Sequence, residues 1–351
     1  MSNVPVLDNN GAVTAALDTP RRRSHTGLRL LFLSVVAIAA ALFALSVGAA
    51  GLPLSDVMAA LTGAGDTTTR TIVLELRLPR VALALVAGGG LALAGAVFQA
   101  VLRNPLAEPY VLGVAGGAAV GAVGAVVFGL AVIPGAVPLA ALAGAIGAMI
   151  LVLRIALRVG RALDTRVLLL AGVVVGAFFN AVILLLLMLA DVESFRSAVF
   201  WMMGSLSGAN WRATALLALY IVPSVLVLLA LARALNLLAI GEETALFLGT
   251  RVERVKLLAY FIASLLVAAA VAACGVIGFI GLIVPHAVRL AWGSDHRLLL
   301  PASALGGGTF LLLADTAARS IAAPAELPVG VITALVGVPV FVLLLRRSPA
   351  L

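Results

Sequence analysis

The stretch "GVAGGAAVGAVGAVVFG", residues 113–129, decides the fold class, because it consists of glycine, alanine and valine with one phenylalanine. About 20 mainly apolar residues are needed to cross the ~30 Å hydrocarbon core of a membrane. The hydrophobic effect does not hold helices together in lipid, so close backbone approach through small residues must do so. The stretch therefore predicts a transmembrane helix in a tightly packed bundle.

The composition of the whole chain agrees with this local reading. Its 351 residues are 63% hydrophobic and 11% charged, with a mean hydropathy of +1.22, whereas soluble domains carry about 25% charged residues. One cysteine and three histidines exclude a disulfide framework and a conventional His/Cys metal site. We therefore expect an all-α integral membrane protein that binds no metal or cofactor of its own.

The apolar runs predict the number of crossings. Nine runs are long enough to span a membrane: 28–50, 80–101, 111–131, 135–157, 165–190, 213–236, 256–276, 299–321 and 328–346. The stretch "LIVPHAVRLAW" at 282–292 is shorter and predicts a short tenth helix buried among neighbours, broken by Pro285. The sequence predicts about ten transmembrane helices.

The basic residues favour this count. With ten crossings, most of the 23 lysines and arginines fall on the same side as the polar N-terminal segment 1–27, as the positive-inside rule requires. The net charge of +8 then reflects topology, and we expect no nucleic-acid partner. We read residues 1–27 as an uncleaved cytoplasmic tail and place both termini in the cytoplasm.

A polar island, "AIGEETALFLGTRVERVK" at 239–256, interrupts the apolar runs and contains the only lysine of the chain. Within it, "GEETALFLG" predicts a short helix bounded by Gly241 and Gly249, with Glu242 and Glu243 at its N-terminal end. Apolar residues on this helix would face away from the membrane, namely Ala245, Leu246 and Leu248. Either a protein partner covers that surface or the island is an ordinary solvated loop.

Several motifs in register resemble the FecCD-like permeases, the membrane subunits of ABC importers for iron chelates and vitamin B12. The motifs are "LRLPR" (76–80), "LRNPLAEPYVLGV" (102–114), "LLLAGV" (168–173), "WMMGSLSGANW" (201–211), "GEETALFLGTRVERVK" (241–256), "GVIGFIGLIVPHAVRL" (275–290) and "APAELPVGVITALVG" (323–337). The resemblance covers residues 28–347 and implies the type II ABC importer permease architecture.

The resemblance also assigns a role to the polar island. It implies coupling helices at about 238–254 that dock on an ATP-binding subunit, with contacts from Gly241, Glu242, Glu243, Leu246, Leu248 and Gly249. The island contains no glycine-rich phosphate-binding loop before its lysine. We therefore expect no enzyme activity from this chain, and ATP and magnesium bound by a separate ATPase chain.

On the outer side, the resemblance implies that Arg77, Arg80 and Arg319 receive carboxylates of a substrate-binding protein. Guanidinium groups bind carboxylates in a bidentate manner, which suits this role. The alternative is that these arginines anchor helix ends at the membrane surface. Asp315 is expected near the same end, paired with Arg319 one turn later.

The resemblance places a gate and a pathway along the axis of a homodimer. The cytoplasmic gate candidates lie in two turns and are Asn104, Leu106, Asp164 and Thr165. The candidates for lining the pathway are Phe178, Phe179, Asn180, Met188, Trp201, Met202 and Met203. A structural turn and ordinary packing are the respective alternatives.

Together these observations predict a permease in the bacterial cytoplasmic membrane, surrounded by lipid. Two copies would assemble with two ATP-binding subunits and a periplasmic or lipid-anchored substrate-binding protein. Iron(III)-siderophore is the first expected cargo, with cobalamin and haem as alternatives. An ion-coupled secondary transporter is the rival from another class, and the scarcity of carboxylates within the spans counts against it.

Overall fold

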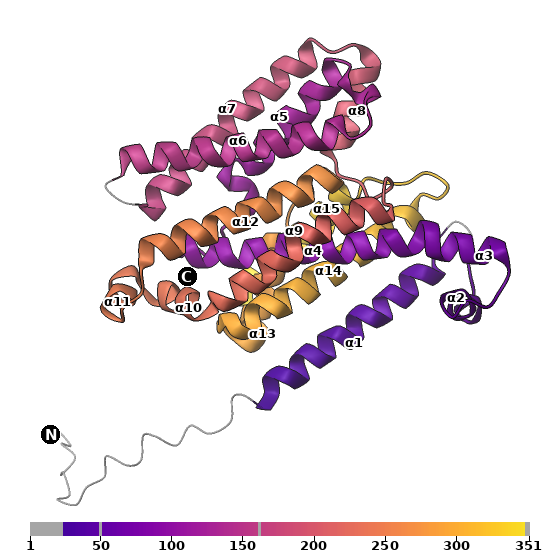
Figure 1. Ribbon diagram of the computed structural model, residues 1–351, viewed down its shortest axis with the longest axis horizontal. Helices are drawn as coiled ribbons and strands as arrows, with labels where there is room; N and C mark the ends of the chain where they lie inside the picture. Colours follow the sequence, from indigo (N-terminus) through magenta and orange to yellow (C-terminus); the bar gives the residue numbers. More distant parts are fainter. Residues whose placement is uncertain (1–23, 49–50, 161–162, 348–351) are drawn as a thin grey trace, which may run out of the picture.

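The computed structural model describes residues 24–48, 51–160 and 163–347, and all regular elements within these ranges are helical (Figure 1). The α-helices are α1 (Ser24–Ser46), α2 (Leu54–Leu61), α3 (Thr67–Thr71), α4 (Leu78–Val101), α5 (Val114–Val127), α6 (Ala136–Val159), α7 (Thr165–Met188), α8 (Val192–Met202), α9 (Trp211–Ala230), α10 (Ala232–Ile240), α11 (Glu242–Phe247), α12 (Val252–Cys274), α13 (Ile280–Trp292), α14 (His296–Ile321) and α15 (Val329–Arg347). Three short helices of other types are η2 (Ile72–Arg77), η3 (Pro109–Leu112) and η4 (Leu130–Val132). The N-terminal segment 1–23 lies outside the described residues.

The predicted spans can be compared with these helices one by one. Within the described ranges, 7 helical stretches are long and apolar enough to cross a membrane, and α5, α13 and α15 are shorter apolar helices. Each of the ten predicted spans coincides with one of them. The predicted class, an all-α membrane protein of about ten helices, is confirmed.

The second predicted span, 80–101, corresponds to α4, and the helical stretch that contains it begins earlier, at Thr67, and continues for 35 residues to Val101. Pro79 lies in the first turn of α4 and cannot donate the backbone hydrogen bond of an α-helix. The chain accommodates this residue with the π-helical turn η2 immediately before it. The hydropathy pattern did not reveal this polar N-terminal extension of the helix, which carries Arg70 and Arg77.

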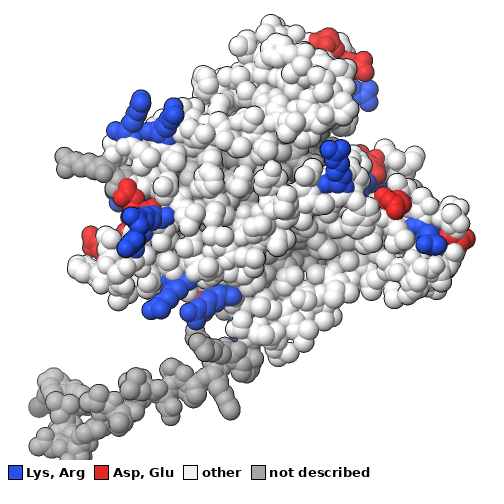
Figure 2. Space-filling view, viewed as in Figure 1, with Lys and Arg blue, Asp and Glu red and all other residues white. Residues whose placement is uncertain are grey.

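The helices form two groups, with α4 at the centre of the larger one (Figure 1). In that group α4 packs against α9, α12, α13 and α14. The other group contains α5, α6, α7 and α8, and it meets the larger group through α12. One end of the molecule carries α2 and α3 and the opposite end carries α10 and α11. Figure 2 shows lysine and arginine side chains gathered around the end with α10 and α11.

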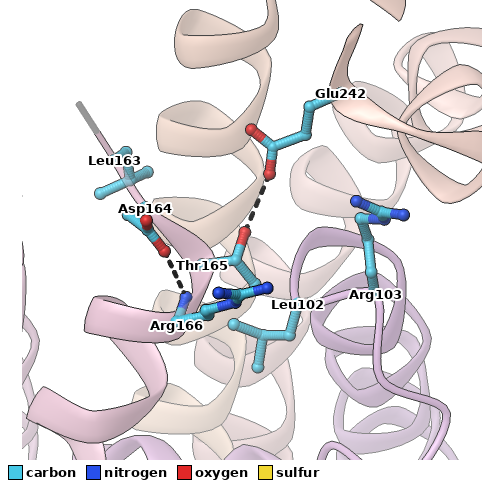
Figure 3. A pocket seen from close by; sticks show the side chains of 7 residues that line it. All are labelled: Leu102, Arg103, Leu163, Asp164, Thr165, Arg166 and Glu242. Carbon is cyan, nitrogen blue, oxygen red and sulfur yellow. Dashed lines mark hydrogen bonds between the residues drawn. The ribbon is translucent and has the colours of Figure 1, made fainter. Parts of the chain in front are cut away.

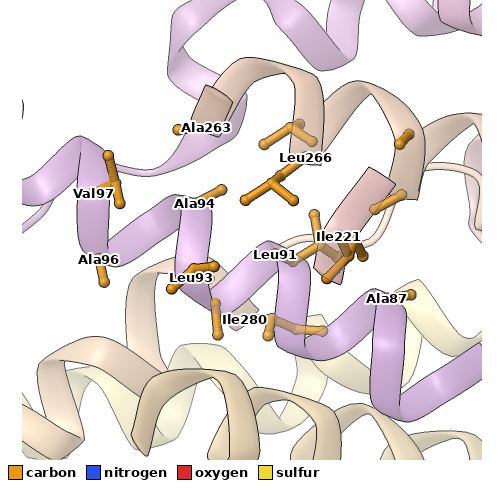
Figure 4. Packing of buried hydrophobic residues seen from close by; sticks show 14 of the residues in the cluster. Ala87, Leu91, Leu93, Ala94, Ala96, Val97, Ile221, Ala263, Leu266 and Ile280 are labelled. Atoms are coloured by element: carbon orange, nitrogen blue, oxygen red, sulfur yellow. The ribbon is translucent and has the colours of Figure 1, made fainter. Parts of the chain in front are cut away.

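Small residues bring backbones into direct contact, as the sequence predicts. A Cβ added to Gly88 of α4 would lie 2.4 Å from the carbonyl oxygen of Gly307 in α14. A Cβ on Gly117 of α5 would lie 2.4 Å from the carbonyl oxygen of Gly144 in α6. Figure 4 shows how alanine and leucine side chains of α4 fill the remaining space against α9, α12 and α13.

The predicted break at Pro285 does not occur, because α13 continues through this residue. Pro285 has no N–H, so the carbonyl of Gly281 loses its partner within the helix. The side-chain amide of Gln99 on α4 donates to that carbonyl at 3.2 Å, and Arg289 donates to the Gln99 amide oxygen at 2.9 Å. A side chain of a neighbouring helix thus replaces the missing backbone bond.

Candidate functional site

The polar island forms the short helix that its sequence predicts, α11, between Gly241 and Gly249. The helix ends in a Schellman motif. The Thr250 N–H donates to the Ala245 carbonyl at 2.9 Å, and the Gly249 N–H donates to the Leu246 carbonyl at 2.9 Å. Gly249 has a left-handed φ of 77°, which glycine adopts without strain. Local sequence therefore determines both the presence and the end of α11.

The exposed surface of α11 differs from the predicted one at two positions. Ala245 is fully buried, so its predicted exposure is wrong, and α11 packs against α10 and α12. Phe247 was not predicted, yet 92% of it is exposed, and Leu246 and Leu248 flank it at 58% and 63%. Sequence reasoning named Leu246 and Leu248 but missed Phe247 between them, although the run of three large apolar residues outside the apolar spans was the signal for it.

The two predicted gate turns have ordinary local hydrogen bonds. In the first turn, the Asn104 side-chain oxygen accepts from the Leu106 N–H at 2.9 Å. In the second, Asp164 caps the N-terminus of α7 by accepting from the Arg166 N–H at 2.7 Å. A cavity of about 590 Å³ lies between these turns and α11 (Figure 3). Its lining residues are Leu102, Arg103, Leu163, Asp164, Thr165, Arg166 and Glu242.

Glu242, predicted as an ATPase contact, and Thr165, predicted as a gate residue, meet in this cavity. The Thr165 hydroxyl donates to Glu242 Oε1 at 3.0 Å (Figure 3). Lys256 Nζ donates to the same oxygen at 2.8 Å and also to the Leu163 carbonyl. We call Glu242, Lys256, Thr165 and the Leu163 carbonyl the inner polar junction. No sequence pattern pointed to Lys256, because the residues that it joins lie 14 and 93 positions away.

At the opposite end, the structure brings the three predicted docking arginines together with two carboxylates. We call Arg77, Arg80, Arg319, Asp315 and Glu326 the outer arginine cluster. Arg80 binds Asp315 in a bidentate manner, with contacts of 2.8 and 2.9 Å, and binds Glu326 at 2.9 Å. The predicted pair of Arg319 and Asp315 is present at 3.8 Å, but Arg80 is the closer partner.

The other two arginines of this cluster donate hydrogen bonds to backbone carbonyls. Arg77 donates to the Leu45 carbonyl at the end of α1, and Arg319 donates to the Val47 carbonyl at 2.8 Å and to the Ala44 carbonyl. A cavity of about 340 Å³ borders the guanidinium groups. All three arginines thus already bind groups of their own chain, and an incoming carboxylate would have to share or replace those bonds.

The predicted pathway residues form no enclosed site within the single chain. Phe178, Asn180 and Met188 are exposed on α7, and Met203 is exposed after α8, whereas Phe179, Trp201 and Met202 are partly buried. Phe178 and Met188 belong to a larger exposed apolar face of α7, which also includes Leu170, Val174, Leu184 and Leu185. Within the described part of the chain, no group of three or more His, Cys, Asp or Glu side chains could hold a metal ion.

Known families and proteins resemble this chain over most of its length. A family model described as the FecCD transport family matches residues 36–347. The cobalamin import system permease protein of Halobacterium salinarum is 48% identical over 80% of this chain and 74% of its own length. The hemin transport system permease protein of Yersinia pestis is 41% identical over 93% of this chain and 97% of its own length.

Comparison with solved structures gives the same assignment. A structure described as an inward-facing conformation of a metal-chelate type ABC transporter superposes with a TM-score of 0.83 at 33% identity, covering 92% of this chain and 100% of that one. Fold, family model and relatives agree over nearly the whole length. The chain therefore belongs to the FecCD transport family, as a multi-pass membrane permease subunit of an ABC importer of the metal-chelate, vitamin B12 or haem type.

Proposed function

We propose that α11 docks on an ATP-binding subunit and that this contact couples ATP hydrolysis to import. The observation that carries the proposal is the surface of Leu246, Phe247 and Leu248, which is apolar, exposed and outside the apolar spans. An apolar surface of this kind at the end of a membrane protein needs a protein to cover it. In an ABC importer the ATP-binding subunit is the partner that fits.

The assembly that follows contains two copies of this chain, two ATP-binding subunits that hold ATP and magnesium, and a substrate-binding protein. The end with α10 and α11 faces the cytoplasm, because basic side chains gather there (Figure 2). Both termini then lie in the cytoplasm. The substrate-binding protein docks at the other end, where the outer arginine cluster offers guanidinium groups to its carboxylates.

The cargo is a preformed metal chelate, and cobalamin is the first one to test. A relative named for cobalamin import is 48% identical and one named for hemin transport is 41% identical. A ferric siderophore, the first expectation from the sequence, and haem are the alternatives. Bare divalent metal is a poorer candidate because the described spans contain few His, Asp or Glu side chains that could bind it.

Uptake into proteoliposomes tests the function. The vesicles would contain this chain, its ATPase and its binding protein, and labelled cobalamin, haem and ferric siderophore would be compared with and without internal ATP. Phe247→Ser should reduce ATP-dependent uptake because it removes the centre of the docking surface.

Phe128→Ser is the matched control, because Phe128 is 69% exposed at the end of α5 remote from α11. ATP-dependent accumulation of one chelate, lowered by Phe247→Ser and unchanged by Phe128→Ser, would support the proposal. Uptake by this chain alone under an ion gradient, indifferent to ATP, would contradict it in favour of a secondary transporter.

A further inference from the structure

The inner polar junction holds the side chain of Lys256 almost completely away from water, whereas its partner Glu242 is 34% exposed. Lys256 is the only lysine of the chain, and its side chain is 2% exposed. Its ammonium group donates to Glu242 Oε1 at 2.8 Å and to the Leu163 carbonyl. Burial of an ammonium group costs several kcal/mol unless it is paired and hydrogen-bonded. The two acceptors meet that condition.

The bonds of the junction form a closed triangle among three separate segments. Glu242 is the first residue of α11, Lys256 lies in α12, and Leu163 and Thr165 belong to the turn that begins α7. Glu242 Oε1 accepts from both Lys256 and Thr165. Each segment is therefore joined directly to the other two, which fixes their relative positions.

Stability alone does not explain this arrangement. A well-packed apolar group in place of a buried ion pair is often equally or more stabilising, so such pairs are weak evidence for stability. Directional bonds instead define one relative position of the segments. The site of the junction is also significant, because α11 carries the exposed surface while the turn at Thr165 contains two of the predicted gate residues.

We propose that the Lys256–Glu242 pair holds α11 and the turn before α7 as one unit, so that movement of α11 is transmitted to the cytoplasmic gate. This inference rests on the proposed function. Glu242 then acts inside the chain as a positioning residue, and the contact with the ATP-binding subunit falls to Leu246, Phe247 and Leu248. The junction stays closed in every nucleotide state, because a unit that opened could not transmit movement.

Amine labelling tests the junction without requiring transport. Because Lys256 is the only lysine, its ε-amine can be followed by peptide mass spectrometry after treatment of the full complex with an amine-acylating reagent. We expect Lys256 to remain unmodified both without nucleotide and with a non-hydrolysable ATP analogue. Glu242→Gln should raise the labelling rate at least about tenfold, equivalent to about 1.4 kcal/mol, because the paired charge is lost.

Glu253→Gln is the matched control for labelling, because Glu253 is exposed in the first turn of the same helix and makes none of the junction bonds. Its labelling rate should equal that of the parent. Rapid labelling of Lys256 in the parent, in either nucleotide state, would overturn the proposal.

The ratio of cargo imported to ATP hydrolysed tests transmission itself. Lys256→Met keeps the length of the side chain and removes its charge, and it should lower this ratio at least about fivefold while ATP hydrolysis persists, since coupling between sites is commonly of that size or larger. Thr165→Val leaves the charged pair intact and removes one bond of the junction, so it should lower the ratio of import to hydrolysis less than Lys256→Met does. This second variant keeps the proposal testable if Lys256→Met does not fold. An unchanged ratio in a folded Lys256→Met complex would overturn the proposal.

Transport and labelling together distinguish an error in the proposed function from an error in the role of the junction. If the parent complex shows no ATP-dependent uptake, the proposed function is wrong, and the labelling result still decides whether the junction exists. If the parent imports its cargo and Lys256→Met imports equally well per ATP, only the role of the junction is wrong.

Discussion

The outer arginine cluster and the inner polar junction both contain buried ion pairs, but they join parts of the molecule that differ in packing. In the outer cluster, Arg80 on α4 binds Asp315 on α14, two helices already in backbone contact at Gly88 and Gly307. In the inner junction, Lys256 and Glu242 join α12 to the six-residue helix α11. The outer pair reinforces an interface that packing has formed, whereas the inner pair sets the position of a segment that packing holds weakly.

The largest effect should follow from Asp315→Asn in the outer cluster. Asp315 is 2% exposed, and its loss leaves the Arg80 charge with only the partly exposed Glu326. We expect the free energy of unfolding to fall by about 3 kcal/mol, measured by thermal unfolding in detergent micelles. The double variant Arg80→Leu/Asp315→Leu should recover part of the loss. No loss in Asp315→Asn would show that the pair does not reinforce the interface.

The second largest loss of stability should follow from a change in the contact between α4 and α14. Gly307→Ala would place a Cβ 2.3 Å from the Ala92 Cβ and 2.5 Å from the Gly88 carbonyl oxygen. We expect a loss of about 2 kcal/mol from overpacking, again measured by thermal unfolding. Gly147→Ala in α6 is the control, since nothing lies within 4 Å of its added Cβ. Equal stability of the two variants would contradict the backbone contact.

In α11, Phe247→Ser should weaken binding to the ATP-binding subunit more than it lowers the stability of the fold. Phe247 is 92% exposed, so the unfolding midpoint should remain that of the parent. Affinity for the ATP-binding subunit should fall about tenfold, or about 1.4 kcal/mol, measured by co-purification at graded concentrations. A fall in stability with unchanged affinity would mean that α11 serves the fold and not a partner.

The smallest effect should come from Glu326→Gln at the outer cluster. Glu326 is 43% exposed, so solvent screening limits the loss of stability to less than about 0.5 kcal/mol. If an incoming carboxylate replaces Glu326 at Arg80, the variant should bind the substrate-binding protein a few-fold more tightly, measured by surface plasmon resonance on reconstituted chain. Weaker binding would place docking elsewhere.

Sequence reasoning predicted what depends on local chemistry. Hydropathy located the spans, and the glycines at 241 and 249 delimited α11, because these signals act over one or two helical turns. Family resemblance placed Arg77, Arg80 and Arg319 on the same face of the membrane, and in the structure all three line one cavity.

Sequence reasoning did not predict the contacts between residues that are far apart in the chain. The contacts of Lys256 with Leu163 and of Arg80 with Asp315 join positions 93 and 235 residues apart. The burial of Ala245 depends on how α11 packs against its neighbours α10 and α12, and six residues of helix carry no clear periodicity from which to predict a buried face.

The amide of Gln99 has a consequence for how α13 can bend. Helices bend most readily at proline, and in α13 the carbonyl released by Pro285 is already bonded to α4 through Gln99. Bending at this point therefore breaks no bond within α13 but stretches one that belongs to its neighbour. The position of α4 therefore limits how far α13 can bend. A tilt of either helix stretches the single hydrogen bond between the Gln99 amide and the Gly281 carbonyl.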